Sequence, residues 1–217
     1  MQETFSRIYE QKTWCCTVAE DGKLVGQTES KSGGGSTLKQ TAIIRQELPS
    51  ILEKFNIRSM LDAPCGDLNW MKEIDLKDCD YIGADIVPDL ITQNITLYSR
   101  SKKTFLVKDI VSDDLPKVDL IFCRDCLVHL SVSDVLKTLS NFKKSGSTYL
   151  LTTTFLGNRK NKINMITGDW HPINLFQTPY NFPEPLLLLN EGCTEGGNQY
   201  SDKSLGLWQL DSLAITP

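Results

Sequence analysis

Short apolar runs alternate with segments of helical spacing along the middle of the chain. The apolar runs predict strands over 59–62, 80–85, 104–108, 118–123 and 147–154. Between them, apolar residues at helical spacing predict helices over 67–74, 88–99 and 132–144, the last opened by a capping box at Ser131. This alternation is typical of an α/β fold, here a Rossmann-like, doubly wound, mostly parallel sheet with helices on both faces.

The flanking segments extend the same pattern. Apolar residues at helical spacing over 38–55 predict another helix, with Thr37 as its N-cap and a restart at Pro49. Further along, the apolar runs 186–190 and 204–210 predict an antiparallel hairpin at one edge of the sheet.

The chain carries no internal repeat and no interdomain linker, which predicts one domain over residues 1–217. Its first part, residues 1–37, is expected to form an N-terminal arm. The arm contains a glycine-rich stretch at 32–37 that has two interpretations. It is a flexible connector, or it presents backbone N–H groups at a helix start, where they attract a carboxylate.

Residues 160–184 are the least periodic segment, rich in Asn, Pro and aromatic residues. Long loops inside a compact domain are usually functional, so we predict a substrate loop here. Trp170, His171, Asn174 and Tyr180 are its candidate substrate-binding residues, because rings stack on the apolar face of a small polar molecule and polar groups bind its hydroxyls. An equally open interpretation is that these four side chains only pack against the rest of the protein.

Composition limits the class of partner. The chain is 40% hydrophobic and 23% charged, with a formal net charge of −4, which does not favour binding to a nucleic-acid backbone. No run approaches the roughly 18 apolar residues of a membrane span, and the first residues do not resemble a signal peptide. We therefore expect a cytoplasmic protein with a glycan or small-molecule substrate, no nucleic-acid partner and no membrane span.

Seven cysteines are scattered through apolar context, an odd number that predicts reduced thiols rather than a disulfide framework. Cys123 and Cys126 have the spacing of a metal-binding pair, but no second pair or flanking histidines complete a zinc site. We therefore predict no metal.

Three acidic residues fall where consecutive strands are expected to end: Asp62, Asp85 and Asp109. A nucleoside offers ribose hydroxyls and an exocyclic amine as donors, and strand-end carboxylates are natural acceptors. Asp85 follows Asp62 by 23 residues, close to the offset of about 20 expected of a ribose-binding acid. No G-x-G-x-x-G follows the first strand, so a dinucleotide is disfavoured.

The string Leu-Asp-Ala-Pro-Cys-Gly-Asp at 61–67 resembles motif I of the class I S-adenosylmethionine (SAM) dependent methyltransferases, although Pro64 and Leu68 stand where glycines are common. The strings at 62–71, 81–86, 123–130 and 205–208 are similar to a subgroup of small methyltransferases found beside or fused to glycosyltransferases, including part of a chlorovirus multidomain glycan-building protein.

The resemblance implies SAM as cofactor, S-adenosylhomocysteine as product, a sugar hydroxyl as acceptor and glycosyltransferases as partners, in a host cytoplasm if the protein is viral. It also implies that Gly66 approaches the methionyl part, Asp85 takes the ribose hydroxyls, and Asp109 with Ile110 frames the adenine. The whole expected cofactor set is Asp62, Ala63, Pro64, Cys65, Gly66, Asp85, Ile86, Asp109, Ile110 and Arg124. A structural ion pair is an equally open role for Arg124.

Methyl transfer to a hydroxyl needs a base that takes its proton. Asp125 and His129 are four residues apart and would share one face of a helical turn. We predict His129 as the base, because imidazole titrates near neutral pH. Asp125 would orient its ring or, if His129 lies far from the site, act as the base itself. Two alternatives stay open: a SAM-dependent methyltransferase of another small metabolite, a carboxylate or amine, and a non-catalytic SAM-binding module.

Overall fold

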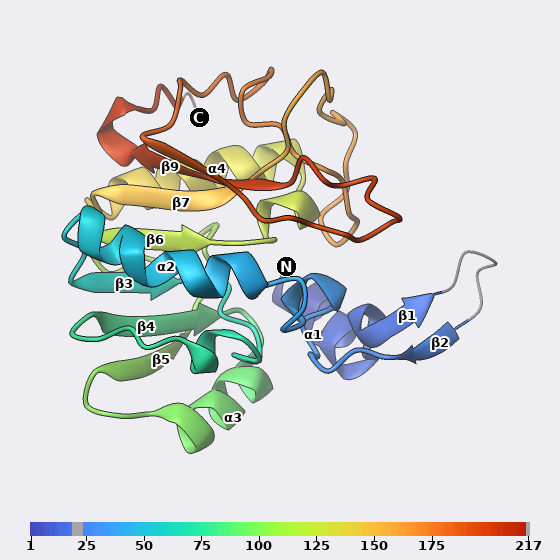
Figure 1. Cartoon of the computed structure of the whole chain (residues 1–217), viewed down its shortest axis with the longest axis vertical. Coiled ribbons are helices and arrows are strands. Elements are labelled where there is room, and N and C mark those ends of the chain that lie inside the picture. The colour runs from blue at the N-terminus through green and yellow to red at the C-terminus, as the bar shows by residue number, and fades with distance from the viewer. Residues whose placement is uncertain (19–23, 216–217) are drawn as a thin grey trace.

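The computed structural model describes residues 1–18 and 24–215, and its centre is a seven-stranded sheet ordered β5-β4-β3-β6-β7-β9-β8 (Figure 1). The strands are β3 (Ser59–Asp62), β4 (Asp80–Asp85), β5 (Lys103–Val107), β6 (Leu120–Cys123), β7 (Tyr149–Thr154), β8 (Leu187–Asn190) and β9 (Ser204–Gln209). The strands β3 to β7 pair in parallel, whereas β9 is antiparallel to both of its neighbours. This confirms the predicted sheet and its edge hairpin.

Strand order reverses at β3, which pairs with β4 on one side and with β6 on the other. In sheets of this kind, ligands bind beyond the carboxyl ends of the strands at such a reversal. The alternating residues Met60 and Leu61 of β3 face two different apolar clusters, one on each side of the sheet.

Three helices cover these two faces. The helices α2 (Ala42–Lys54) and α3 (Pro88–Tyr98) pack their buried residues into the cluster that holds Met60. The helix α4 (Val132–Lys144) packs into the opposite cluster, and the side chain of Ser131 accepts a hydrogen bond from the backbone of Asp134, as the capping box predicts. None of the helices among residues 1–18 and 24–215 is long and apolar enough to cross a membrane.

The helix predicted over 67–74 is wrong. Turns lead from β3 to a short 3-10 helix, Met71–Glu73. Gly66 and Leu68 have left-handed backbones with φ of 56° and 53°, which an α-helix does not contain. The backbone N–H of Asp67 donates to the side chain of Ser32 in the N-terminal arm, so a tertiary contact holds this turn.

The helix predicted over 38–55 starts later than expected. Its N-cap is Thr41 rather than Thr37, and its first residue is Ala42. The preceding turn is closed by the Thr41 hydroxyl, which donates to the carbonyl of Thr37 at 2.8 Å. Pro49 lies inside α2 and does not interrupt it, because the buried stripe around Leu48 anchors both halves of the helix to the sheet.

The N-terminal arm has structure of its own. It contains α1 (Gln2–Glu10), a 3-10 helix (Thr13–Cys15) and the antiparallel pair β1 (Cys16–Val18) and β2 (Leu24–Gln27). The arm lies beyond the carboxyl ends of the parallel strands (Figure 1). Its place identifies it as a wall of whatever site lies at those ends.

Candidate active site

A cavity of about 420 Å³ lies at the carboxyl ends of β3, β4 and β6, under the arm. Its size suits a small-molecule ligand. It brings together twelve of the residues predicted from sequence: Asp62, Pro64, Cys65, Gly66, Asp85, Ile86, Asp109, Ile110, Arg124, Asp125, His129 and Trp170. Ala63 does not line it, because its side chain is fully buried in the core behind Pro64.

Two buried carboxylates end β3 and β4. Asp62 Oδ2 accepts a hydrogen bond from the Tyr81 hydroxyl at 2.6 Å, and Asp85 accepts from the backbone N–H groups of Gly66 and Val87 at 3.2 and 3.1 Å. Burial raises the pKa of Asp62 to about 7 and that of Asp85 to about 6. Within the described residues neither carboxylate has a salt-bridge partner, so both can accept hydrogen bonds from a ligand.

Asp109 forms the next part of the same wall, just past β5. Its Oδ1 accepts a hydrogen bond from the backbone N–H of Val111, and its own N–H donates to Asp113, both at 2.9 Å. These bonds fix the turn and leave Asp109 and Ile110 lining the cavity.

The glycine-rich stretch packs against the turn after β3. Asp67 holds it there by accepting hydrogen bonds from the hydroxyls of Ser30 and Ser32 and from the backbone N–H of Lys31. A Cβ on Gly66 would collide with the Ser32 hydroxyl, so only glycine allows this approach. The stretch is thus neither a free connector nor the start of a long helix, since only a 3-10 turn, Gly34–Ser36, forms within it.

Arg124 lies in a buried network of opposite charges. Its Nε donates to Glu191 Oε1 at 2.6 Å, Lys203 Nζ donates to Asp125 Oδ2 at 2.5 Å, and Lys203 also lies 3.2 Å from Glu191 Oε2. The side chains of Arg124 and Lys203 are each 4% exposed and that of Glu191 is 1% exposed. The Arg124 guanidinium also donates to the carbonyl of Gly35 in the arm. Arg124 therefore forms a structural ion pair, one of the two roles considered for it from the sequence, and it does so at the edge of the cavity.

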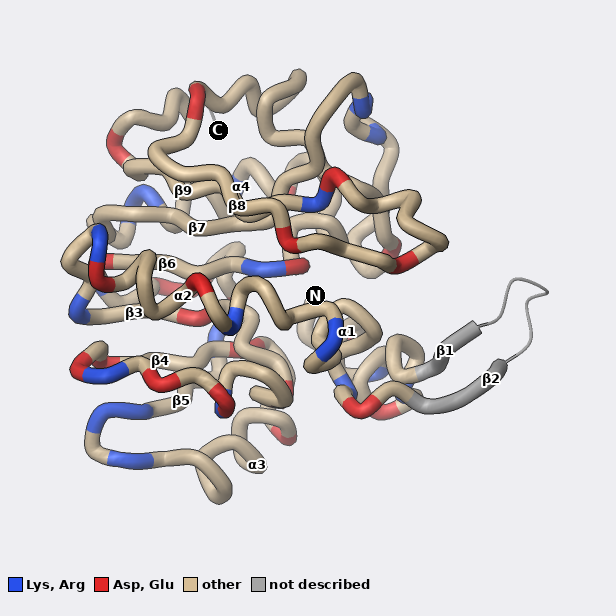
Figure 2. The backbone as a smooth tube through the Cα atoms, viewed as in Figure 1, with Lys and Arg blue, Asp and Glu red and all other residues tan. Residues whose placement is uncertain are grey.

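The network determines the chemistry of Asp125. Although burial opposes ionisation, Lys203 and Arg124 hold the pKa of Asp125 down, at about 2. Figure 2 shows the adjacent basic and acidic positions at the end of β6. Asp125 is thus ionised at neutral pH and a poor proton acceptor there.

His129 belongs to a 3-10 helix, Leu127–His129, and its Nδ1 lies 2.9 Å from the carbonyl oxygen of Asp169. A carbonyl only accepts, so Nδ1 carries the proton and Nε2 is the basic atom of the ring. Burial lowers the pKa of His129 below its usual 6.5. The ring is therefore neutral at neutral pH.

The predicted Asp125–His129 pair is wrong as a hydrogen-bonded unit. Asp125 precedes the 3-10 turn with a left-handed φ of 53°, and its carboxylate bonds to Lys203. The imidazole is oriented by the Asp169 carbonyl instead.

The predicted substrate loop divides into two parts. Trp170, 43% exposed, lines the cavity beside Phe155 and Tyr200, with ring centroids 6.3 and 4.9 Å away. The structure does not bring the other three candidates to this cavity. His171 Nε2 accepts from the Lys162 backbone, Asn174 is 1% exposed and bonds to loop backbone, and Tyr180 packs in the core.

Several lining residues were not found from the sequence: Phe5, Tyr9, Trp14, Glu195, Tyr200 and Lys203. Charged positions directly beside the two C-terminal apolar runs, Glu191 and Lys203, were the available signal for the ion network. The spacing of residues along the sequence does not indicate that Trp14 lies beside the other residues of the site.

Cysteine and metal chemistry add little here. Cys65, Cys126 and Cys193 line the cavity as thiols outside any disulfide. Over residues 1–18 and 24–215, no group of three or more His, Cys, Asp or Glu side chains is placed to hold a metal ion.

Known proteins with this fold were found by structure alone. No family model matches the sequence, and no curated protein matches it. The chain is similar to human N-acetylserotonin methyltransferase in complex with SAM, with a TM-score of 0.58, 14% identity and 95% of this chain covered. It spans 59% of the length of that human protein.

It is also similar to the methyltransferase domain of a bacterial Hen1 protein, with a TM-score of 0.56, 13% identity, and coverage of 80% of this chain and 100% of that domain. The chain therefore has the fold of SAM-dependent methyltransferases.

Proposed function

We propose that this chain is a SAM-dependent O-methyltransferase that acts on a sugar hydroxyl. The observation that carries the proposal is one cavity with two kinds of group. It holds two strand-end carboxylates, Asp62 and Asp85, that form no salt bridge among the described residues, and it holds His129, a neutral histidine oriented by a hydrogen bond. The fold shared with two methyltransferases, one of them in complex with SAM, supports the same conclusion.

The residues at the ends of β3 to β5 fit this cofactor. A buried carboxylate without a cation, such as Asp85, is suited to accept hydrogen bonds from the two ribose hydroxyls. Gly66 leaves room for close approach at the turn, and Asp109 with Ile110 offers an acceptor and an apolar surface for the adenine. When bound, SAM supplies a methyl group already activated on a sulfonium.

The protein then needs to align the acceptor and take its proton. His129 Nε2 accepts the hydroxyl proton, and the Asp169 carbonyl keeps the ring in the required orientation. Asp125 stays ionised because of Lys203, so its negative charge faces the imidazolium that forms. The rings of Phe5, Tyr9 and Trp14 in the arm line the cavity in which this step takes place.

A sugar is the acceptor that the rim of the cavity supports best. Trp170, which is 43% exposed, is held edge-on by Phe155 and Tyr200, and its exposed ring is suited to the apolar face of a pyranose. The resemblance to methyltransferases found beside glycosyltransferases supports the same acceptor and suggests glycosyltransferases as partners in the cytoplasm.

The test is an acceptor panel incubated with the protein and SAM and read by mass spectrometry. We expect a glycan to gain one methyl group, and His129→Ala to suppress the product. Methylation of a carboxylate or amine metabolite instead would identify the alternative acceptor class. SAM binding without transfer to any acceptor would identify a binding module and contradict the proposal.

A further inference from the structure

We infer that Trp14, in the N-terminal arm, is a positioning residue for His129 that fixes the plane of the imidazole in the active site. The inference rests on the proposed function, in which His129 is the base. It assigns a role in the chemistry to a segment outside the strands and turns that bind the cofactor.

The geometry is that of a stacked pair. The indole of Trp14 and the imidazole of His129 have centroids 4.4 Å apart and planes inclined by 28°. Both residues line the same cavity. A hydrogen bond from Nδ1 to the Asp169 carbonyl holds one edge of the imidazole. That bond alone allows the ring to swing about it, and the stack removes this freedom because it defines the plane of the ring.

Trp14 is itself held in place. Phe5 of α1 packs against it with centroids 6.0 Å apart. Gly33 approaches the backbone end of the residue so closely that a Cβ there would lie 3.3 Å from Trp14 Cβ. Trp14 is thus in contact with both α1 and the glycine-rich stretch.

The arm also contacts the loop segment around Gly168, which is hydrogen-bonded to His129. The backbone N–H of Gly168 donates to the His129 carbonyl at 2.8 Å, and a Cβ on Gly168 would lie 2.9 Å from Thr4 Cγ2 of α1. Thr167 fixes the same segment by donating to Asp134 at 2.6 Å. The arm, His129 and the loop around Gly168 therefore pack against one another.

The stack also affects the proton affinity of His129. Burial is the largest influence and lowers its pKa, the Asp169 carbonyl and the Asp125 carboxylate raise it, and the Lys203 ammonium lowers it. The indole covers one face of the ring. It shields that face from water, which disfavours the imidazolium, and its π-system attracts the imidazolium, which favours it. Removal of the indole should therefore change the pKa of His129.

The experiment is an NMR titration of the ring-labelled histidines. The chain has two histidines, so His171 is an internal reference, assigned with His171→Gln. In Trp14→Ala we expect a changed pKa at His129, broadened or multiple ring signals as the imidazole samples more than one orientation, and an unchanged His171. Trp14→Phe should restore both properties of His129. Trp14→Leu, which keeps apolar bulk, replaces Trp14→Ala if that variant does not fold.

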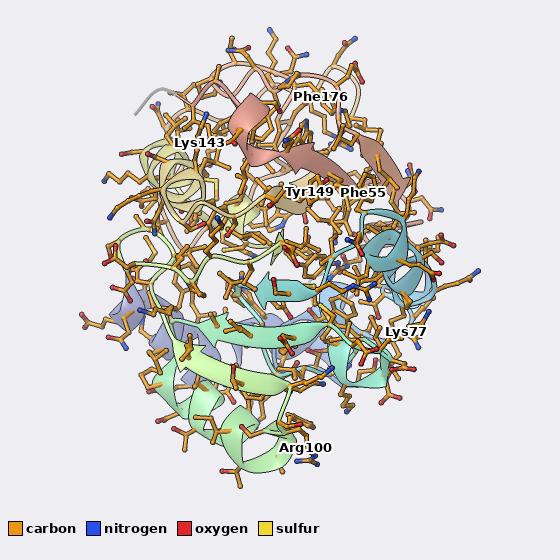
Figure 3. All side chains as sticks on the ribbon, turned by 90° about the vertical axis from the view of Figure 1, so that its left-hand side faces the viewer. Phe55, Lys77, Arg100, Lys143, Tyr149 and Phe176 are labelled. Atoms are coloured by element: carbon orange, nitrogen blue, oxygen red, sulfur yellow. The ribbon has the colours of Figure 1, made fainter. Side chains whose placement is uncertain are left out.

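The matched control removes a ring elsewhere. Phe55 packs against Tyr149, 5.7 Å between centroids, at the end of α2 (Figure 3), and Phe55→Ala should leave the His129 titration unchanged. With an acceptor in hand, Trp14→Ala should lower kcat by roughly 10- to 100-fold with little change in SAM affinity.

An unchanged pKa and a single, unchanged ring orientation of His129 in folded Trp14→Ala or Trp14→Leu overturns the inference, whether or not methyl transfer is found. Failure of the proposed function would instead appear as absent transfer or absent SAM binding in the wild-type protein. The two failures are therefore distinguishable.

Discussion

The two walls of the cavity use the same residue type in opposite ways. The wall that we propose binds the cofactor, called the cofactor wall, is formed by Asp62, Asp85 and Asp109. It comes from the ends of β3, β4 and β5, which are consecutive along the chain. The wall that we propose faces the acceptor, called the acceptor wall, is formed by Arg124, Asp125, His129, Trp170 and Lys203. It joins segments far apart, since Asp125 and Lys203 are separated by 78 residues.

Burial raises the pKa of Asp85 to about 6 because no cation lies against it, whereas two cations lower the pKa of Asp125 to about 2. The role of an acidic residue at a strand end therefore depends on which residues from distant parts of the sequence contact its carboxylate. An unpaired acid is available to a ligand, and a paired acid stabilises the wall. The following predictions test this division, starting with the largest expected effect.

Loss of the base should have the largest effect. His129→Ala removes the proton acceptor, so kcat should fall by roughly 10²- to 10⁴-fold, while SAM affinity, which depends on the other wall, stays the same. Initial-rate kinetics and calorimetry measure the two quantities. Equal losses in both would show that the walls are not separate.

Breaking the ion network should cost stability rather than cofactor affinity. Glu191→Gln leaves the buried cations of Arg124 and Lys203 with the Asp125 carboxylate alone, and removal of one partner of a buried pair typically costs about 3–5 kcal/mol. Urea unfolding measures the loss. Glu53→Gln, which breaks an exposed pair with Lys77, is the matched control and should change little. Similar losses in both variants would contradict a special role for the network.

The two walls should also differ in how pH affects unfolding. Asp85 has a folded pKa of about 6, above its usual 3.8, so its ionised form opposes folding and stability falls as pH rises between these values. At about 1.4 kcal/mol per unit, the change approaches roughly 3 kcal/mol. Asp125, with its pKa lowered to about 2, acts oppositely: its contribution is present above 3.8 and is lost as pH falls towards 2.

Denaturant unfolding of the ligand-free protein at about pH 4.5 and about pH 7.5 should therefore show greater stability at the lower value. Asp62, with its pKa raised to about 7, acts in the same direction, so Asp85→Asn should reduce this difference without removing it and should stabilise the protein at the higher pH. A difference of the same size in wild type and Asp85→Asn would show that Asp85 does not contribute to it.

Local sequence predicted the cofactor wall better than the acceptor wall. The strands were found because their apolar runs are continuous, and acids such as Asp62 and Asp85 stand directly at their ends. The helix predicted over 67–74 does not form, because Leu68 takes a left-handed backbone in a turn that Asp67 ties to Ser32 of the arm, 35 residues away. Periodicity describes neighbours along the chain and carries no information on such contacts.

The acceptor wall depends almost entirely on distant contacts. Spacing suggested that Asp125 would face His129, yet Lys203 binds Asp125 from another strand, and the Asp169 carbonyl takes its place at the imidazole. Asn174, a polar residue in an aromatic loop, bonds to backbone instead of lining the cavity, because a long loop must satisfy its own buried polar groups.

The central claim is that the cofactor wall binds SAM through Asp85, and calorimetric titration of SAM into wild type and Asp85→Ala tests it most directly. Loss of charge-assisted hydrogen bonds worth roughly 1.5–3 kcal/mol should weaken SAM binding about ten- to a hundredfold. Asp80→Ala, at the exposed start of the same strand, should bind SAM like wild type, and NAD should bind far more weakly. Unchanged SAM affinity in a folded Asp85→Ala protein would contradict the account.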